Sequence, residues 1–296
     1  MSMKKLKEAL EAGEFTITAE CGPPKGTDIA EMLEHAKHLL GKINAINVTD
    51  NQSAVVRIGS LPVCRLLSEM GHDPIFQLTC RDRNRLAIQS DLMGAHILGI
   101  RNVLCMTGDH VSAGDHKTAK PVYDLESVQL LQTVAALNGG HDLAGNEMKG
   151  ATNLYQGAVV TPEANPLEPQ MLKFEKKVKA GANFFQTQAI YDMDNFRRFM
   201  DRARKHKVKV LAGILLLKNA GMANFLNKFV PGITVPQELI DRLKAAGKEG
   251  ALECGMDIAA EQVRTIKEQG IADGAHVMAI GLENKVPEIL KRAGIA

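Results

Sequence analysis

The sequence has no tryptophan, and aromatic residues make up only 4% of its 296 residues. Its formal net charge is only +2, so electrostatics give no reason to expect nucleic acid or an anionic membrane as a partner. No stretch approaches the roughly 20 apolar residues that a membrane span requires. The start of the chain, Met1–Leu10, is typical of a short amphipathic helix and lacks the apolar segment of a signal peptide. We therefore expect a cytoplasmic protein.

Cysteine is also scarce, with five residues that are widely spaced and never arranged as C-x-x-C. This spacing disfavours an internal zinc or iron–sulfur site, and we expect no metal in this chain. Cys80 and Cys105 close predicted strands and should be buried, whereas Cys21, beside Glu20, could be exposed. The dinucleotide motif G-x-G-x-x-G after a strand and the phosphate-loop motif G-x-x-x-x-G-K-[ST] are absent as well. Any nucleotide must therefore be held by the main fold itself.

What the sequence does contain is a repeated alternation of strand and helix patterns. In Phe15–Glu20 apolar and polar residues alternate, and Gly22-Pro23-Pro24 then ends the strand. The expected strands are Phe15–Glu20, Asn44–Asp50, Pro74–Cys80, Asn102–Gly108, Gln156–Thr161, Asn183–Ile190, Val208–Leu215 and Ala275–Gly281. No tight Asn-Gly hairpin joins them, so the sheet should be parallel. Eight strands favour a closed (β/α)8 TIM barrel, with extra helices in Met222–Gln269 between the seventh and eighth strands, and a single domain over residues 1–296.

Glycine positions give a prediction about helix ends. Three predicted helices end in a similar tripeptide, with glycine at the position where a chain commonly leaves a helix. These tripeptides are Met93-Gly-Ala, Ala180-Gly-Ala and Asp273-Gly-Ala.

Polar residues close the predicted strands, and in a barrel these positions share one mouth, where catalysis takes place in this fold. The expected ring consists of Glu20, Thr49-Asp50-Asn51, Gln77-Leu-Thr79, Thr107-Gly108-Asp109, Pro162-Glu163, Gln188 and Asn219. Two carboxyls in one mouth can be held in different protonation states. We expect Glu20, on an apolar strand, to stay protonated and Asp109, in a glycine turn, to be ionised, although Asp109 could equally well only cap its loop.

A basic run on the fifth long helix, Lys173, Lys176 and Lys177, has the spacing of one helix face. Such a run is commonly a solvated face. Near a barrel mouth it could instead neutralise a diphosphate.

The strand-end motifs, in order along nearly the whole chain, resemble the 5,10-methylenetetrahydrofolate reductase family. The motifs are Thr18-Ala-Glu20-Cys-Gly-Pro-Pro24, Asn47-Val-Thr49-Asp50, Gln77-Leu-Thr79-Cys80, Gly108-Asp109, Pro162-Glu163, Lys177-Val-x-Ala-Gly-Ala-Asn183, Gln186-Thr-Gln188 and Ala212-Gly-Ile-Leu215. The resemblance implies a single flavin-binding barrel that reduces methylenetetrahydrofolate to 5-methyltetrahydrofolate in a ping-pong reaction, with hydride delivered from flavin N5.

The resemblance also implies roles for particular residues. Glu20 resembles the family's general acid, and Asp109 the acid beside flavin and pterin. Gln188 resembles the amide that binds substrate, with Phe225 or Leu226 at the position of an aromatic clamp. The positions that resemble flavin-binding ones are Thr49, Gln77, Met106, Thr107, Gly108, Asp109, Thr161, Asn165, Lys173, Lys176, Lys177 and Met278. The lysines favour FAD over FMN.

Several of these residues depart from the family pattern. Gln77 stands where NADH-using members have histidine, Met106-Thr107 replaces Leu-Arg, and Met278 replaces a flavin-side tyrosine. The electron donor is therefore open between NAD(P)H and a reduced iron–sulfur partner subunit, as in anaerobe-type members, and a homo- or hetero-oligomer is implied.

Two other functions compete with this interpretation. A flavin barrel of the proline dehydrogenase type would need a basic pair near the eighth strand, which Ala275–Asn284 lacks. A pterin- or flavin-binding docking subunit, inactive without its electron-transfer partner, stays open.

Overall fold

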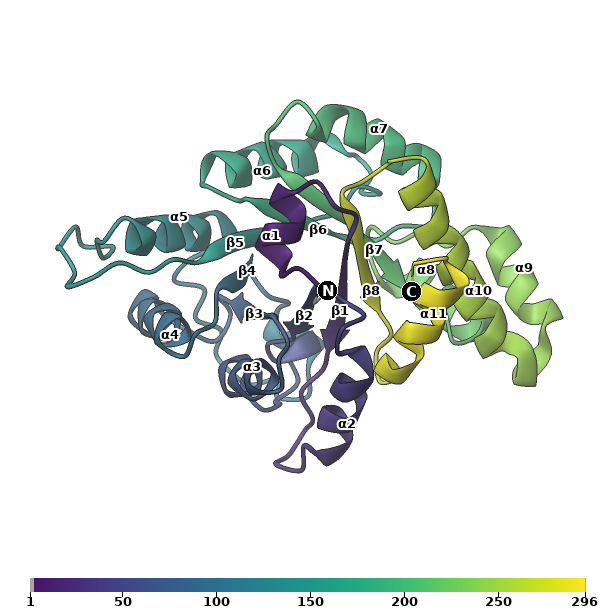
Figure 1. Cartoon of the computed structure of the whole chain (residues 1–296), viewed down its shortest axis with the longest axis horizontal. Coiled ribbons are helices and arrows are strands. Elements are labelled where there is room, and N and C mark those ends of the chain that lie inside the picture. Colours follow the sequence, from purple (N-terminus) through teal and green to yellow (C-terminus); the bar gives the residue numbers. More distant parts are fainter. Residues whose placement is uncertain (1–2, 296) are drawn as a thin grey trace.

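Eight parallel strands close into a barrel in the computed structural model, which describes residues 3–295 (Figure 1). Each strand pairs with its neighbour in sequence, and β8 pairs with β1 to complete the ring. The strands are β1 (Thr16–Cys21), β2 (Ala45–Val48), β3 (Pro74–Thr79), β4 (Asn102–Met106), β5 (Tyr155–Val160), β6 (Phe184–Ala189), β7 (Lys209–Leu215) and β8 (Gly274–Met278). The predicted TIM barrel is therefore confirmed.

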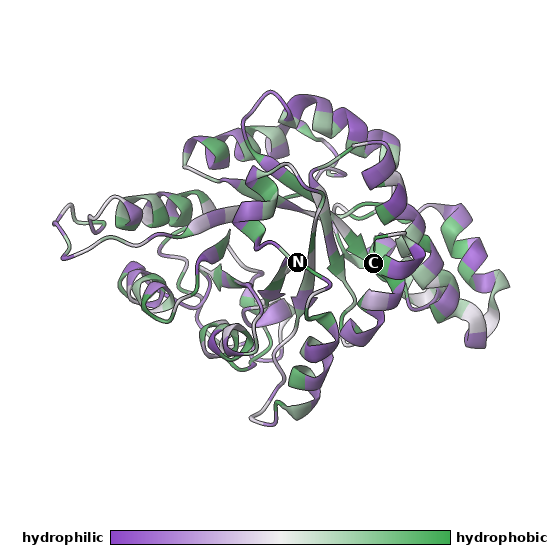
Figure 2. Ribbon diagram, viewed as in Figure 1, coloured by the Kyte–Doolittle hydropathy of each residue, from purple (hydrophilic) through white to green (hydrophobic). Residues whose placement is uncertain are grey.

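Helices surround the barrel and turn their apolar faces toward the strands (Figure 2). They are α1 (Leu6–Glu11), α2 (Ala30–Leu39), α3 (Ser60–Glu69), α4 (Arg85–Ile97), α5 (Ser127–Asn138), α6 (Glu168–Lys179), α7 (Met193–Ala203), α8 (Ala220–Phe229), α9 (Gln237–Ala245), α10 (Gly247–Glu268) and α11 (Val286–Arg292). Short 3-10 turns are η1 (Gln52–Ala54), η2 (Val111–Ala113) and η3 (Glu283–Lys285). Three helices, α8 to α10, stand between β7 and β8, as predicted, and have their own apolar cluster.

The inside of the barrel is apolar near the end where the strands begin and polar near the end where the strands finish. Helix α1 covers the end where the strands begin, as Figure 1 shows, and its Leu6 and Leu10 are fully buried. They pack with a layer made of Ala45, Ile75, Leu104, Phe184 and Leu211. Above this layer the inward positions are polar, so the opposite end forms the mouth.

Some sequence predictions need correction. The helix predicted from Met1 begins at Leu6, and Met1 and Ser2 lie outside the described residues. Only Ala180-Gly181 ends a helix as expected, because Gly94 lies inside α4 and Gly274 begins β8. Cys21 is buried rather than exposed, since it points outward from β1 into the layer beneath α2. Within residues 3–295, no helix combines the length and apolarity required to cross a bilayer.

Candidate active site at the barrel mouth

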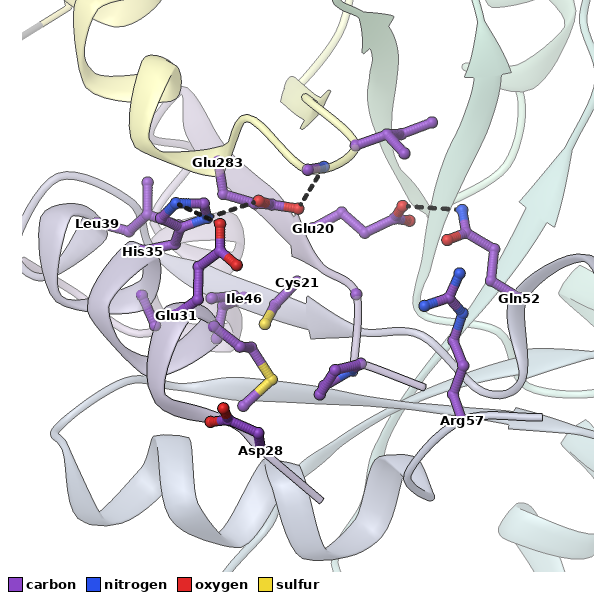
Figure 3. Close-up of a pocket in the computed structure, with 16 residues that line it drawn as sticks. Glu20, Cys21, Asp28, Glu31, His35, Leu39, Ile46, Gln52, Arg57 and Glu283 are labelled. Carbon is purple, nitrogen blue, oxygen red and sulfur yellow. Dashed lines mark hydrogen bonds and ion pairs between the residues drawn. The ribbon is translucent and has the colours of Figure 1, made fainter. Parts of the chain in front are cut away.

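Glu20 lies near the carboxyl end of β1, with 12% of its side chain exposed. Gln52 Nε2 donates to Glu20 Oε1 over 3.4 Å, as Figure 3 shows, and His276 Nε2 lies 3.9 Å from Oε2. The period of two along β1 explains this position, because Thr18 and Glu20 point inward while Ile17, Ala19 and Cys21 join the outer core. One carboxyl is thus held between two nitrogens at the mouth.

A buried polar network lies directly beneath Glu20. Gln186 and Asn47 exchange two amide hydrogen bonds of 2.7 and 3.0 Å across the barrel, from β6 to β2. Gln186 Nε2 also donates to Thr18 Oγ1 over 3.2 Å, and Thr18 Oγ1 lies 2.9 Å from His276 Nδ1. Gln186 Nε2 also lies 3.4 Å from His276 Nδ1, and because an amide nitrogen can only donate, Nδ1 is the acceptor and the proton of a neutral ring is on Nε2. His276 therefore presents an N–H donor to Glu20.

Thr49 and Gln77 continue the mouth from β2 and β3, and both are buried. Thr49 is only 2% exposed, and its hydroxyl oxygen has no hydrogen-bond partner among residues 3–295. Asp50, which was expected in the same ring, is turned away from it. Its Oδ2 accepts from the Thr79 amide and hydroxyl, and Arg83 binds both of its oxygens. Asp50 is therefore a structural residue that fixes the loop after β3.

The turn after β4 has an unusual backbone. Gly108 has φ of +88°, and a Cβ at this position would lie 3.0 Å from Thr79, so a larger residue would be both strained and crowded. Thr107 Oγ1 accepts from the Ser127 amide and so caps α5. Met106 is half-buried, while the Asp109 side chain is exposed and its carbonyl accepts from Tyr123. This turn places the Asp109 carboxylate at the rim.

Gln188 lies in a bulge near the end of β6, where the register with β7 shifts between Gln186 and Ala189. Thr187 Oγ1 accepts from the Gly213 amide and donates to the Gln188 carbonyl. A Cβ on Gly213 would lie only 2.4 Å from the Thr187 carbonyl oxygen, so only glycine allows β7 to approach this closely. Bulges of this kind commonly re-aim a side chain beside an active site. Here the bulge leaves Gln188 half-buried at the mouth.

The three lysines do not form one exposed patch, which corrects that prediction. Lys177 is 5% exposed, and its Nζ donates to the Val159 carbonyl over 2.7 Å. Burial lowers the pKa of Lys177 to about 8. Lys173 lies on the exposed side and pairs with Glu126 over 3.4 Å, and Lys176 is exposed. The spacing placed all three on one side of α6 but could not show that the Lys177 side chain reaches inward to β5 while its two neighbours stay exposed.

The remaining predicted residues are spread around the mouth and its edges. Glu163 accepts from the Tyr191, Asp192 and Thr234 amides, and burial raises the pKa of this carboxyl. It therefore ties loops together, while Asn219 caps α8.

The other positions differ mainly in exposure. Thr161 and Met278 are half-buried, and Asn165 is exposed. Phe225 is 55% exposed, whereas Leu226 is packed in the apolar cluster of α8 to α10 and is 6% exposed. Of the two clamp candidates, Phe225 is therefore the one that a ligand can reach.

The mouth has features that fit a flat cofactor with hydrogen-bonding edges. The unpartnered Thr49 hydroxyl and the Gln77 amide supply polar groups from β2 and β3. Gly108 leaves the backbone open where any Cβ would be crowded. Within residues 3–295, no group of three or more potential metal ligands is close enough to bind a metal ion. The Thr49 hydroxyl, the Gln77 amide and the open backbone at Gly108 suit the hydrogen-bonding edge of an organic cofactor.

Sequence reasoning missed two residues of the site, His276 and Gln52. His276 stands within an apolar strand, where a histidine is easily taken for a packing residue, and it is 258 positions from its partner Thr18. The alternation along β8 could have revealed it, because His276 and Met278 are two residues apart and therefore point to the same, inward side of the strand. Gln52 lies in an irregular turn that no period describes.

The fold and the site together define a (β/α)8 barrel whose mouth is polar and contains a buried acid. A family model described as methylenetetrahydrofolate reductase matches residues 5–294, and the chain belongs to that family. The resemblance inferred from the motifs is thereby confirmed.

Individual relatives agree with this assignment. Methylenetetrahydrofolate reductase 2 of Schizosaccharomyces pombe is 27% identical over 232 residues, which cover 74% of this chain but 35% of that protein. The chain thus spans about a third of the length of that relative. The 5,10-methylenetetrahydrofolate reductase of Pectobacterium carotovorum is 24% identical, with 88% of this chain and 84% of that protein covered.

A solved structure has the same fold. It is an uncharacterized protein from Clostridium thermocellum that binds two copies of 5-methyl-5,6,7,8-tetrahydrofolic acid. The two superpose with a TM-score of 0.66 at 15% identity, over 98% of this chain and 100% of that one. At this identity the similarity concerns the fold alone.

Proposed function

We propose that this chain reduces 5,10-methylenetetrahydrofolate to 5-methyltetrahydrofolate, with Glu20 as general acid and a flavin, FAD rather than FMN, bound in a single barrel domain. The observation that carries the proposal is the position of Glu20, a largely buried carboxyl between Gln52 and His276 at the mouth of a barrel of this family. The folate-binding neighbour of the same fold supports the substrate class.

The acid acts on the closed five-membered ring of the substrate. Glu20 donates its proton to the ring nitrogen that leaves the methylene carbon, so that a C–N bond breaks and an iminium carbon forms. A carboxylate then remains at Glu20, and the Nε2–H of His276 and the amide of Gln52 stabilise its charge. These two donors lie beside the carboxyl before the reaction begins, so little reorganisation is needed.

A bound flavin would supply the hydride that reduces the iminium carbon to a methyl group. Thr49, Gln77, Gly108 and Met278 would hold its ring system, with Met106, Thr107 and Thr161 beside them. Lys173, Lys176 and Asn165 on the exposed side would approach its phosphates, and buried Lys177 would add charge from beneath. The residues at the rim, Asp109, Gln188 and Phe225, would orient the pterin and its aromatic tail.

The test is an anaerobic absorbance titration of the purified protein reconstituted with FAD. Addition of 5-methyltetrahydrofolate should bleach the flavin bands by running the reaction in reverse. Glu20→Gln should bind the flavin with an unchanged spectrum and bleach at least about 100-fold more slowly.

Separate addition of NADH to the same sample distinguishes the electron donors. Bleaching by NADH indicates a self-sufficient enzyme, and bleaching by folate alone indicates a partner subunit as donor. A protein that takes up neither FAD nor FMN, or that is not bleached by the folate, would refute the proposal.

A further inference from the structure

A cavity of about 280 Å³ lies beside Glu20, between β1, α2 and the loop after β8 (Figure 3). Its floor is apolar and is formed by Met32, Ala36, Leu39 and Ile46. Its rim is polar, with Glu20 and Gln52 on one side and His35, Glu31 and Glu283 on the other, as the close-up shows. A polar cavity of this size has room for several water molecules.

The titratable groups of the rim run from solvent toward Glu20. The Glu31 side chain is 89% exposed, His35 20% and Glu283 11%. His35 Nε2 lies 4.0 Å from Glu31, and its Nδ1 lies 3.1 Å from Glu283 Oε2. The Gly281 amide holds the other oxygen, Glu283 Oε1, at 2.9 Å. The cavity therefore connects a proton-exchanging surface with the carboxyl at the mouth.

This arrangement meets a need of the proposed function, on which the inference rests. Each reduction of the folate consumes one proton at Glu20, and the carboxyl must be protonated again before the next turnover. In the proposed function, folate and flavin would both occupy the mouth. A second route to Glu20 that does not pass through the mouth would allow this step while both remain in place.

We propose that His35 and Glu283 deliver protons to Glu20 through water in this cavity. A proton from solvent adds to His35 Nε2 as the Nδ1–H proton passes to Glu283 Oε2. Glu283 then gives a proton to a cavity water as that water gives one of its own to Glu20. One O–H bond breaks at Glu283, one forms at Glu20, and the water is unchanged. His35, one-fifth exposed, regains its Nδ1–H form by exchange with solvent.

The charges around His35 favour the movement of protons from solvent into the cavity. Carboxylates face it from three elements, namely Glu31 on α2, Glu283 on η3 and, across the cavity, Glu20 on β1. Glu34, also on α2, is paired with Lys37. Asp28 adds a further carboxylate, and Arg57 is the cation that lines the cavity. Cys21 also lines it, but burial raises the pKa of its thiol to about 12, so that it does not exchange protons near neutral pH. An acidic rim of this kind attracts protons from solvent.

The experiment compares the first turnover with later ones in the FAD-loaded enzyme. Reduced enzyme is mixed rapidly with 5,10-methylenetetrahydrofolate in dilute buffer, with a chemical reductant in excess. Glu283→Gln keeps an oxygen for the Gly281 amide but cannot carry a proton, and His35→Gln breaks the route one step earlier. His38→Gln, on the exposed side of the same helix, is the matched control.

We expect both route variants to complete the first turnover at the wild-type rate, because only the later turnovers depend on a renewed supply of protons to Glu20. Later turnovers should be about 10-fold slower with KM unchanged, and added imidazole should restore them. His38→Gln should match wild type throughout. Wild-type steady-state rates in both route variants, or an equally slow first turnover that imidazole does not restore, would overturn the proposal. If the wild-type enzyme itself reduces no folate, the proposed function fails instead.

Discussion

At the scale of single residues, environment decides what each polar group can do. His276 and His35 are both histidines near a carboxylate, yet their surroundings differ. His276 is 3% exposed and fixed by Thr18 inside the barrel, whereas His35 is one-fifth exposed beside solvent. The first can only orient and stabilise a neighbour, while the second can exchange its protons.

This difference gives a prediction for His276. Under the proposed function, replacing His276 by Phe removes the N–H that faces Glu20, so a carboxylate formed there by acid catalysis would lose a donor. We expect kcat for folate reduction to fall by about 10- to 100-fold with little change in KM. His276→Gln, which retains an amide donor, should recover part of the loss. Steady-state kinetics with circular dichroism of each variant checks this, and equal kcat for wild type and His276→Phe would contradict it.

Lys177 gives a prediction about pH. Its pKa is 10.5 in an exposed chain and about 8 in the fold, so between these values the unfolded chain binds more protons. The free energy of unfolding should therefore rise with pH through this window. Below pH 8 the full penalty applies, roughly 3 kcal/mol from the size of the shift.

Lys177→Met should remove that contribution to the pH dependence. Urea denaturation of the flavin-free protein at pH 7 and pH 10 measures it, and Lys176→Met, an exposed neighbour, serves as the control. If Lys177→Met shows the same pH dependence as wild type, the charge of Lys177 is not carrying a burial penalty.

At the scale of elements, close backbone approaches position the helices. Gly255 in α10 lies against the end of β7, where a Cβ would be only 1.8 Å from the Leu217 carbonyl oxygen. Gly250, one turn earlier in the same helix, would place its Cβ 3.5 Å from Ala246, an ordinary contact. A side chain would therefore clash at Gly255 but would fit at Gly250.

Alanine at these two positions should have opposite effects. Gly255→Ala forces α10 away from the barrel and should cost about 1–3 kcal/mol of unfolding free energy. Gly250→Ala should be neutral or should stabilise by up to about 1 kcal/mol, since alanine favours helix. Chemical denaturation of both variants measures the difference, and equal midpoints would show that α10 is free to shift.

At the scale of the whole molecule, the residues that close and stabilise the barrel lie at the opposite end from those of the polar mouth. The end where the strands begin is closed by α1, and the opposite end carries the polar mouth. Leu10→Ala, at a fully buried position of α1, should cost about 2–5 kcal/mol and leave the KM for folate unchanged. Leu86→Ala, at a side chain 74% exposed on α4, should stay within about 0.5 kcal/mol. Thermal melts and kinetics check both, and a raised KM in Leu10→Ala would argue against this separation.

The sequence predicted the barrel and much of its mouth because strand alternation and strand ends are local patterns. These patterns were enough to place four residues at the mouth: Glu20, Thr49, Gln77 and Gln188. It could not predict which inward side chains meet, since the contact of His276 with Glu20 depends on how β8 closes against β1. The burial of Lys177 depends on its contact with the Val159 carbonyl of β5, and the position of Gly94 inside α4 depends on helix length, which no single tripeptide sets.

The position of α1 also determines how the protein would be oriented if it were immobilised on a surface through its N-terminal region. Because α1 sits over the closed end of the barrel, a tether attached near residue 3 would turn the mouth toward the solution. Small molecules would then have free access to the mouth, which would face away from the support. Direct electronic contact with an electrode would instead call for attachment near the rim, for example on the exposed loop beside Asp109.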